Sequence, residues 1–319
     1  MFNRSERLVV TSVTIGGLLE WYEFFLYPYL APVISQNFFQ NESNFFNLVN
    51  AMMIFAIGFI SRPLGALFFG HIGDRYGRKM ALLLSIIMIT LPSFAIGLLP
   101  TYAQIGIAAS LMLLAMRLLQ GFLVGGEISG VMCYLVEEAA PKRRRFMTSW
   151  AFFGPQWGAV LCIAECLLLE KYLSPEDLVN WGWRFSFIAG GVLGLVGCFL
   201  RYGLKETPVF RSLQSHNTVT LAPIFQSFRN HKKSMAYGFL ISALPMAGAF
   251  LIFIFFPLYY EKILGWDFSR SLIISEILVA ISTVSLPIFG KIKDKYSNKF
   301  ILIICSIGII LFAYEPIPN

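Results

Sequence analysis

Long apolar stretches separated by short basic connections dominate this chain of 319 residues. Nine stretches can be marked, each close to or above the twenty residues that an α-helix needs to cross about 30 Å of hydrocarbon. They run over residues 9–34, 46–69, 80–99, 105–137, 147–169, 184–204, 234–257, 270–289 and 300–315. None shows the alternating polarity of the strands in a membrane barrel. Because lipid satisfies no backbone hydrogen bonds, we predict an all-α membrane protein of about nine transmembrane helices.

Composition and charge agree with a membrane protein. Hydrophobic residues make up 57% of the chain and charged residues 13%, with a mean hydropathy of +0.68, which excludes an ordinary soluble domain. Lys and Arg outside the stretches fall mostly on the side of the N-terminus, nineteen against four, with Arg201 counted among the nineteen. We therefore expect a cytoplasmic N-terminus. These basic connections explain the net charge of +7 better than a nucleic-acid surface does.

Motifs for enzymatic chemistry are missing from the sequence. No G-x-x-x-x-G-K-[ST] loop is present, so we expect no ATP hydrolysis. The five cysteines fall within predicted spans and the three histidines lack metal-ligand spacing. The sequence therefore predicts neither an enzyme nor a cofactor or metal site, and transport would draw on an ion gradient or on the solute's own.

A basic turn occurs twice. GHIGDRYGRK, from Gly70 to Lys79, follows the second stretch, and the degraded copy GKIKDKYSNK, from Gly290 to Lys299, follows the eighth. The repeat predicts a duplicated transporter. We expect residues 1–204 to form a six-helix bundle, 205–233 a cytoplasmic linker, and 234–319 part of a second bundle with three helices. By the repeat, three more spans would follow residue 319.

Two carboxylates lie at the centre of the first stretch. Glu20 and Glu23 are three residues apart, hence on one helical face. Charges at the bilayer centre are costly, and two neighbouring carboxylates there should not both ionise easily. Together with Glu127 they are our candidates for proton coupling. The alternative is a polar pair at the membrane edge. Glu165 is a further intramembrane carboxylate, expected either to line a cavity or to meet a neighbouring helix.

A polar stripe marks the fourth stretch, where Arg117, Gln120, Val124 and Glu127 follow one another at helical spacing. Such a stripe faces the bundle interior. Arg117 cannot release its proton and needs an anion, either a buried carboxylate (Glu20, Glu23 or Glu127) or the substrate. We expect Arg117 and Gln120 to bind substrate; the alternative is a permanent ion pair. Arg62, about one turn from the end of the second stretch, is expected to have a structural role and to extend toward the membrane surface; the alternative is a role in substrate binding.

Aromatic residues and glycines supply further candidates. Trp21, Tyr22, Tyr27 and Trp157 are expected to form an aromatic wall suited to a quaternary ammonium. In the basic turn, Gly65, Gly70 and Gly73 should let another helix approach and Gly77 should permit the turn itself. Asp74 is a candidate helix cap. Arg75, Arg78 and Lys79 either pair with Asp74 or lipid headgroups, or serve topology alone.

Five motifs together resemble the metabolite:proton symporter branch of the major facilitator superfamily, close to bacterial proline/betaine transporters. They are GGLLEWYEF (Gly16–Phe24), RPLGALFFGHIGDRYGRK (Arg62–Lys79), RLLQGFLVGGE (Arg117–Glu127), WGWRFSF (Trp181–Phe187) and LKETPVF (Leu204–Phe210). The resemblance implies two six-span halves, alternating access, and import of a small polar metabolite with protons across a bacterial inner membrane. Glu23 departs from the aspartate usual at this position.

The resemblance also implies a cytoplasmic gate. It would be made of Gly70, Gly73, Asp74, Arg75, Gly77 and Arg78 in the turn, with Glu138 and Arg145 after the fourth span in a salt-bridge network. The resemblance as a whole covers almost all of this chain but only about three quarters of a family member. Two alternatives follow for the function. One is a symporter, complete through a separately encoded C-terminal part or active with nine spans. The other is a truncated remnant that inserts without transport.

Overall fold

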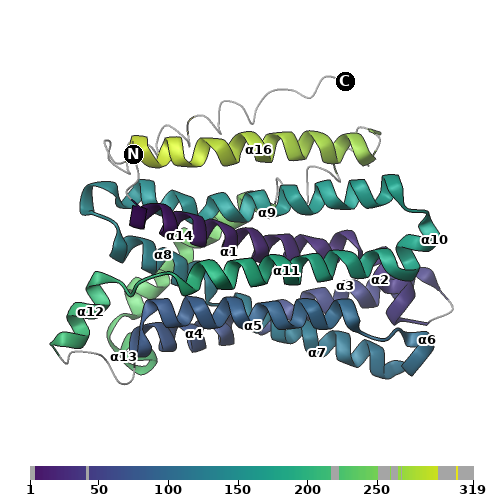
Figure 1. Cartoon of the computed structure of the whole chain (residues 1–319), viewed down its shortest axis with the longest axis horizontal. Helices are drawn as coiled ribbons and strands as arrows, with labels where there is room; N and C mark the ends of the chain where they lie inside the picture. Colours follow the sequence, from purple (N-terminus) through teal and green to yellow (C-terminus); the bar gives the residue numbers. More distant parts are fainter. Residues whose placement is uncertain are drawn as a thin grey trace.

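The protein is an antiparallel bundle of long helices (Figure 1). The computed structural model describes residues 4–40, 43–216, 223–250, 259, 265–266, 268–293 and 307, and within these ranges there is no β-strand. Six helices or helix pairs of the described chain are long and apolar enough to cross a membrane. They are α1 (Arg4–Tyr29), α3 with α4 (Asn44–Ile60, Arg62–Tyr76), α5 (Arg78–Leu98), α7 with α8 (Ile107–Val124, Glu127–Glu138), α9 (Arg144–Tyr172) and α11 (Trp183–Tyr202).

Short helices lie at the two ends of this bundle. The end that holds α2 (Ala31–Phe38), α6 (Tyr102–Ile105), α10 (Pro175–Asp177) and the π-helix η2 (Leu178–Gly182) is opposite the N-terminus. The other end carries the N-terminus, the α4–α5 turn, the 3-10 helix η1 (Pro141–Arg143) and α12 (Pro208–Ser215) (Figure 1). We call this second end the basic end, since the turn and η1 bring their Arg and Lys residues there.

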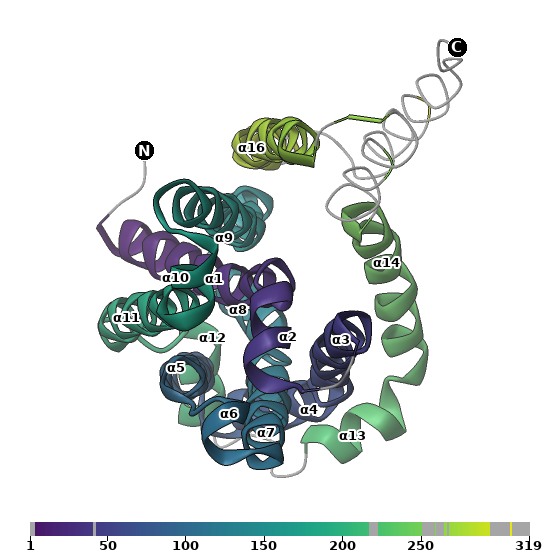
Figure 2. The same ribbon diagram turned by 90° about the vertical axis from the view of Figure 1, so that its right-hand side faces the viewer.

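Helix α1 is central to the packing. It lies between α9 and α11, while α5 packs between α11 and α7, and α3 packs on α7, as the end-on view shows (Figure 2). Side chains of α1 fill the interior, including Leu19, Tyr22, Leu26 and Tyr27, each at most 1% exposed. Any polar group on the inner face of α1 is therefore held among several spans.

The second and fourth spans approach so closely that side chains are excluded between them. A Cβ added at Gly65 would lie 1.6 Å from the Phe122 carbonyl oxygen, and one at Gly121 would lie 1.8 Å from that of Gly58. Ser61, at the junction of α3 and α4, donates to the Leu118 carbonyl at 2.8 Å. The expected close approach at Gly65 is confirmed. At Gly70 it is wrong for the described part of the chain, where an added Cβ would meet nothing within 4 Å.

The second span is longer than the sequence predicted. Helix α4 continues through Tyr76, so most of the basic motif Gly70–Lys79 is helical and the connection to α5 is the single residue Gly77. Gly77 has φ +114°, a conformation that favours glycine, as expected for the turn. Arg62 consequently begins α4 and lies about 21 Å from its last residue, at 1.5 Å per residue. The prediction that Arg62 reaches the membrane surface at that end is wrong.

Within the described residues, four helices follow the bundle. The expected linker contains α12 and α13 (Pro223–Asn230), and then come α14 (Lys232–Phe250) and α16 (Phe268–Lys293). Helix α16 packs along α9, where Ser282 and Thr283 both donate to the Gln156 side-chain oxygen at 2.9 Å. The described part of the second half thus contacts the first through the fifth span. The predicted ninth span, 300–315, and most of the second turn copy lie outside the described residues.

Candidate functional site: a buried cavity between the first, second and fourth spans

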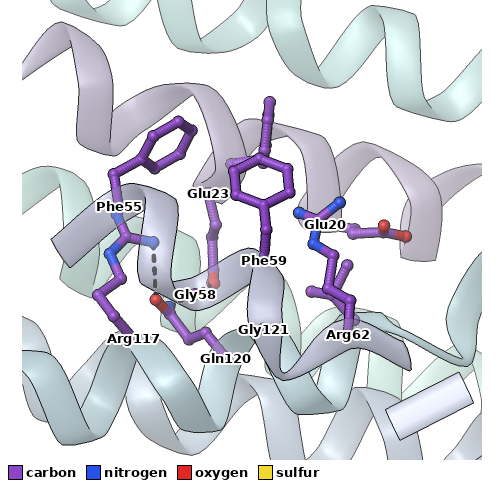
Figure 3. Close-up of a pocket in the computed structure, with 11 residues that line it drawn as sticks. Glu20, Glu23, Phe55, Gly58, Phe59, Arg62, Arg117, Gln120 and Gly121 are labelled. Carbon is purple, nitrogen blue, oxygen red and sulfur yellow. Dashed lines mark hydrogen bonds between the residues drawn. The ribbon is translucent and has the colours of Figure 1, made fainter. Parts of the chain in front are cut away.

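A cavity of about 40 Å³ lies at the centre of the bundle, among α1, α3, α4 and α7 (Figure 3). Four polar residues that the sequence singled out line it together, namely Glu20, Glu23, Arg117 and Gln120. Each is only 4–6% exposed. The remaining lining residues are Phe24, Phe55, Gly58, Phe59, Arg62, Gly121 and Val124. Since one water needs at least about 10–15 Å³, this volume admits water but not a solute of several heavy atoms.

A hydrogen-bonded chain crosses the cavity from the fourth span to the first. Arg117 Nη1 donates to Gln120 Oε1 at 2.8 Å, the bond drawn in Figure 3. Gln120 Nε2 donates in turn to Glu23 Oε2 at 3.0 Å and to Ser93 Oγ at 3.3 Å. The Gln120 amide therefore stands between the guanidinium and the carboxylate, and Arg117 forms no direct ion pair with a carboxylate in the described part of the chain.

Arg117 has unused hydrogen-bonding capacity. Its Nε and Nη2 atoms are buried and lack partners among the described residues. The guanidinium carbon lies 3.7 Å from the centre of the Tyr27 ring, a cation–π contact that fixes its position. Tyr27 is itself anchored by its hydroxyl, which donates to the Ala51 carbonyl at 3.1 Å. The arrangement holds a cation rigidly while leaving donors free for an anion.

Glu20 occupies the other part of the cavity beside Arg62 (Figure 3). Its Oε2 atom is buried without a partner in the described chain, and Arg62 is among the groups that act on it electrostatically. The Arg62 guanidinium lies 4.4 Å from the Phe59 ring centre and 5.0 Å from that of Phe24. The sequence favoured a structural role for Arg62 over substrate binding because it placed the end of the helix too near; the structure places Arg62 in the cavity. Two cations and two carboxylates thus face one small cavity.

Glu127 lies apart from this cavity and is paired with Arg201. Both guanidinium nitrogens of Arg201 donate to the Glu127 carboxylate, Nη1 to Oε2 at 2.9 Å. Ser85 Oγ donates to the same oxygen at 2.7 Å, and Arg201 Nη1 reaches the Leu82 carbonyl at 2.7 Å. Arg201 is 1% exposed. Counting it with the loop residues was wrong, because its side chain lies inside the bundle.

The predicted aromatic wall is divided by the fold. Tyr27 packs under Arg117, whereas Trp21, Tyr22 and Trp157 are not among the residues that line the central cavity. Trp21 packs against Phe24 and Phe25, and Trp157 against Phe153. The aromatic lining comes instead from Phe24, Phe55 and Phe59, which contact one another in tilted and edge-on pairs. A period of four in the second span, Phe55 and Phe59, is the signal that would have found them.

At the basic end, the motif residues join the network that the resemblance implied, with different partners. Arg78 pairs with Asp74, and Arg78 Nε lies 3.0 Å from Glu137 Oε1. Thr207 Oγ1 donates to the other Glu137 oxygen at 2.6 Å. The carboxylate in this network is thus Glu137, where the sequence pointed to Glu138.

Glu206, just before Thr207, caps the start of α5. Its carboxylate accepts from the backbone N–H groups of Arg78, at 3.0 Å, and of Lys79, at 3.1 Å. A carboxylate at a helix N-terminus is stabilised by these unpaired donors and by the helix dipole. Asp74, the candidate cap, instead pairs with Arg78. Gly73 has only ordinary contacts and Arg145 offers its carbonyl to Thr148.

The sequence is similar to those of known membrane transporters. The family model described as Major Facilitator Superfamily matches residues 13–314. The chain belongs to the major facilitator superfamily. It is 32% identical to the glycine betaine/proline/ectoine/pipecolic acid transporter OusA of Dickeya dadantii, over 96% of this chain and 63% of that protein. It is 30% identical to the proline/betaine transporter of Escherichia coli, with the same two coverages. The chain therefore spans 63% of the length of both relatives.

Solved structures agree on the fold. The proton:xylose symporter XylE, bound to 6-bromo-6-deoxy-D-glucose, superposes with a TM-score of 0.73 at 17% identity, covering 92% of this chain and 70% of XylE. The human organic anion transporter MFSD10 gives a TM-score of 0.53 at 14% identity, covering 91% and 73%. At these identities the likeness concerns the fold alone. The resemblance to major facilitator transporters drawn from the motifs is confirmed.

Proposed function

We propose that this chain is a secondary active transporter that carries a small polar metabolite together with protons by alternating access. The substrate class is a compatible solute such as proline or betaine, or an organic acid. The names of the relatives from Dickeya dadantii and Escherichia coli support the first class. The observation that carries the proposal is the buried Arg117, which Tyr27 and Gln120 hold in place and whose Nε and Nη2 atoms have no partner among the described residues.

Coupling follows from the chain Arg117–Gln120–Glu23. While Glu23 is ionised, it is the anion at the end of this series of hydrogen bonds, and the Gln120 amide links its negative charge to the Arg117 guanidinium. Protonation of Glu23 removes that negative charge, and Arg117 then binds the carboxylate of the solute more strongly. Solute binding must favour protonation of Glu23 by the same factor, since coupling between two sites is reciprocal. Proton and solute therefore enter the cavity together.

Glu20 and the phenylalanines of the cavity would bind the ammonium group of a zwitterionic solute. Glu20 has a buried oxygen without a partner in the described chain, and Phe24, Phe55 and Phe59 line the same cavity. A carboxylate with aromatic rings around it suits an ammonium group. Because 40 Å³ holds only water, a solute would enter when the spans separate, as alternating access requires.

The remaining assignments belong to the same proposal. Residues 1–204 form the N-terminal bundle, 205–233 the linker and 234–319 part of a second bundle, in a bacterial inner membrane with the N-terminus in the cytoplasm. The basic end is then cytoplasmic, and the network around Arg78 stabilises its closed form. The separately encoded C-terminal part stays a prediction, as do the nine spans and the roles of Trp21, Trp157 and Glu127.

The test is uptake by cells that lack their own proline and betaine carriers and express this chain. Labelled proline, betaine and 2-oxoglutarate are supplied with and without a proton gradient. We expect gradient-driven accumulation of one of them, and we expect Glu20→Gln and Glu23→Gln to abolish accumulation while sparing exchange. Glu170→Gln, an exposed carboxylate on α9, is the control.

Two results would contradict the proposal. Unchanged accumulation in both Glu20→Gln and Glu23→Gln would remove the proton role from these residues. If the chain inserts and folds but neither transports nor binds any of the three solutes, the alternative of an inactive remnant stands. Nothing in the comparisons favours that alternative.

A further inference from the structure

A further, part-buried carboxylate lies where α9 packs on α1, on the face of α1 away from the central cavity. The Glu165 carboxyl group, on α9, is hydrogen-bonded to the Tyr22 hydroxyl. The same hydroxyl lies 2.9 Å from the carbonyl oxygen of Ser186 on α11. Tyr22 is 0% exposed, so three spans meet at this one oxygen atom, away from bulk water.

Counting hydrogens at this junction indicates the state of Glu165. A tyrosine hydroxyl has one hydrogen, and a backbone carbonyl can only accept. If Glu165 were ionised it too could only accept, and one hydrogen cannot point at two acceptors. If Glu165 carries the hydrogen, it donates to the Tyr22 oxygen and Tyr22 donates to Ser186. Every contact then contains one hydrogen.

The surroundings of Glu165 also favour a neutral acid. Its second oxygen, Oε1, is buried and has no partner in the described chain, and none of the ion pairs formed by the described residues includes it. The ionisable groups around the junction are Tyr22 and Glu23 on α1 and Cys162 and Cys166 on α9. None of these is a cation. An ionised carboxylate buried without a cation is strongly disfavoured.

Among the residues that the structure describes, neighbouring helices add no opposite charge at this level. Helix α11 contributes the Ser186 carbonyl here, and its only cations are Arg184, which donates to the Gly97 and Leu99 carbonyls, and Arg201, which pairs with Glu127. On α16, the contacts of Thr283 with Gln156 and of Gly290 with Ser149 fix an antiparallel register. That register places residue 276, itself a glutamate, within about one turn of the level of Glu165.

The junction adjoins the coupling carboxylate. A Cβ added at Gly190 of α11 would lie 3.1 Å from the Tyr22 ring and 3.3 Å from Glu23 Oε1. Tyr22 and Glu23 thus lie side by side against α11 at Gly190, which has no side chain. The Glu23 Oε1 atom is buried and unpartnered within the described chain. Movement of α11 away from α1 would uncover the Tyr22 ring and Glu23 together.

We propose that Glu165 is a third proton-binding site of the transporter, rests protonated in this conformation against Tyr22, and releases its proton to water when α9 moves away from Tyr22. Its role in transport rests on the function proposed above, whereas its protonation does not. In the cycle, the O–H bond of Glu165 breaks, the proton passes to a water molecule and the carboxylate becomes solvated.

The test is infrared spectroscopy of the purified chain in lipid nanodiscs, which detects the C=O stretch of protonated carboxyl groups without any transport. At neutral pH we expect a band that is lost in Glu165→Gln and kept in Glu170→Gln. Tyr22→Phe removes the hydrogen-bond partner but not the acid, so the band should shift and persist. A spectrum of Glu165→Gln identical to the unmodified chain, with near-ultraviolet circular dichroism showing a folded protein, would overturn the proposal.

Transport assays separate this site from the central cavity. Glu165→Gln is expected to reduce the number of protons moved per solute while leaving solute exchange intact. If the Glu165 band is present but uptake does not depend on the proton gradient, Glu165 is protonated as proposed and the symport proposal is wrong. If uptake is coupled to protons but the band is absent, the symport proposal holds and the proposal for Glu165 is wrong.

Discussion

Glu127→Gln should destabilise the bundle by about 3–5 kcal/mol, the usual result of removing one partner from a buried ion pair. Arg201 would stay charged, because a guanidinium does not release its proton in proteins. It would keep its bonds to Leu82 and Ser85 but lose the carboxylate that accepts from both of its terminal nitrogens. An amide has one acceptor oxygen, and its NH₂ group would face the donors of Arg201.

The magnitude should fall in the lower part of that range. Glu20 also interacts electrostatically with Arg201, and the negative charge of Glu127 disfavours its ionisation; without that charge Glu20 can ionise more easily and compensate part of the Arg201 charge. Arg201→Met should be less harmful than Glu127→Gln, because the stranded Glu127 can take up a proton and become neutral whereas Arg201 cannot lose one. The double variant Glu127→Gln, Arg201→Met should be more stable than Glu127→Gln alone, since no buried charge is left at this place.

The assay is unfolding in mixed detergent and dodecyl sulfate micelles, followed by circular dichroism, with Glu170→Gln as the control. A free energy of unfolding for Glu127→Gln within about 1 kcal/mol of the unmodified chain would refute the reasoning. So would single effects that simply add in the double variant, because additivity means that the two groups do not interact.

Three other predictions concern packing, capping and binding. Gly121→Ala should disrupt the contact of α7 with α3, since its Cβ would lie 1.8 Å from the Gly58 oxygen, whereas Gly70→Ala should be neutral; the fraction of monodisperse protein on size-exclusion chromatography compares them. Glu206→Ala should lower the free energy of unfolding by about 0.5–2 kcal/mol through loss of the α5 cap, and an unchanged value would mean that water replaces it. Arg117→Lys should lose most solute binding, because a lysine cannot present the paired donors of a guanidinium; normal binding by isothermal calorimetry would make Arg117 a scaffold residue.

The spans of the first half could be predicted from hydropathy alone, because membrane-length apolar segments have only one local solution. The errors in placing single charged residues have specific causes. Arg201 stands in the last turn of α11 at the basic end, where a count of charges assigns it to the aqueous side. Helical side chains lean toward the helix N-terminus, which for α11 means back into the bundle.

Two further errors in the site depend on helix rotation. Glu137 and Glu138 are adjacent in the sequence and differ by about 100° around α8, so the motif alone could not tell which of them meets Arg78. Likewise Glu127 belongs to the polar stripe of the fourth span by its spacing. The helix is interrupted between Val124 and Glu127, so the residues after that point follow a separate helix, and Glu127 meets Arg201 rather than the central cavity.

The position of Arg201 has a consequence for how related sequences can diverge. A Cβ on Gly16 would lie 1.9 Å from Arg201 Nη2, so α1 can pass the guanidinium only where its own side chain is missing. Residues 16, 127 and 201 therefore constrain one another. In an alignment of close homologues they should co-vary as a triplet, with a larger residue at 16 accompanied by loss of the arginine and of the acid that neutralises it.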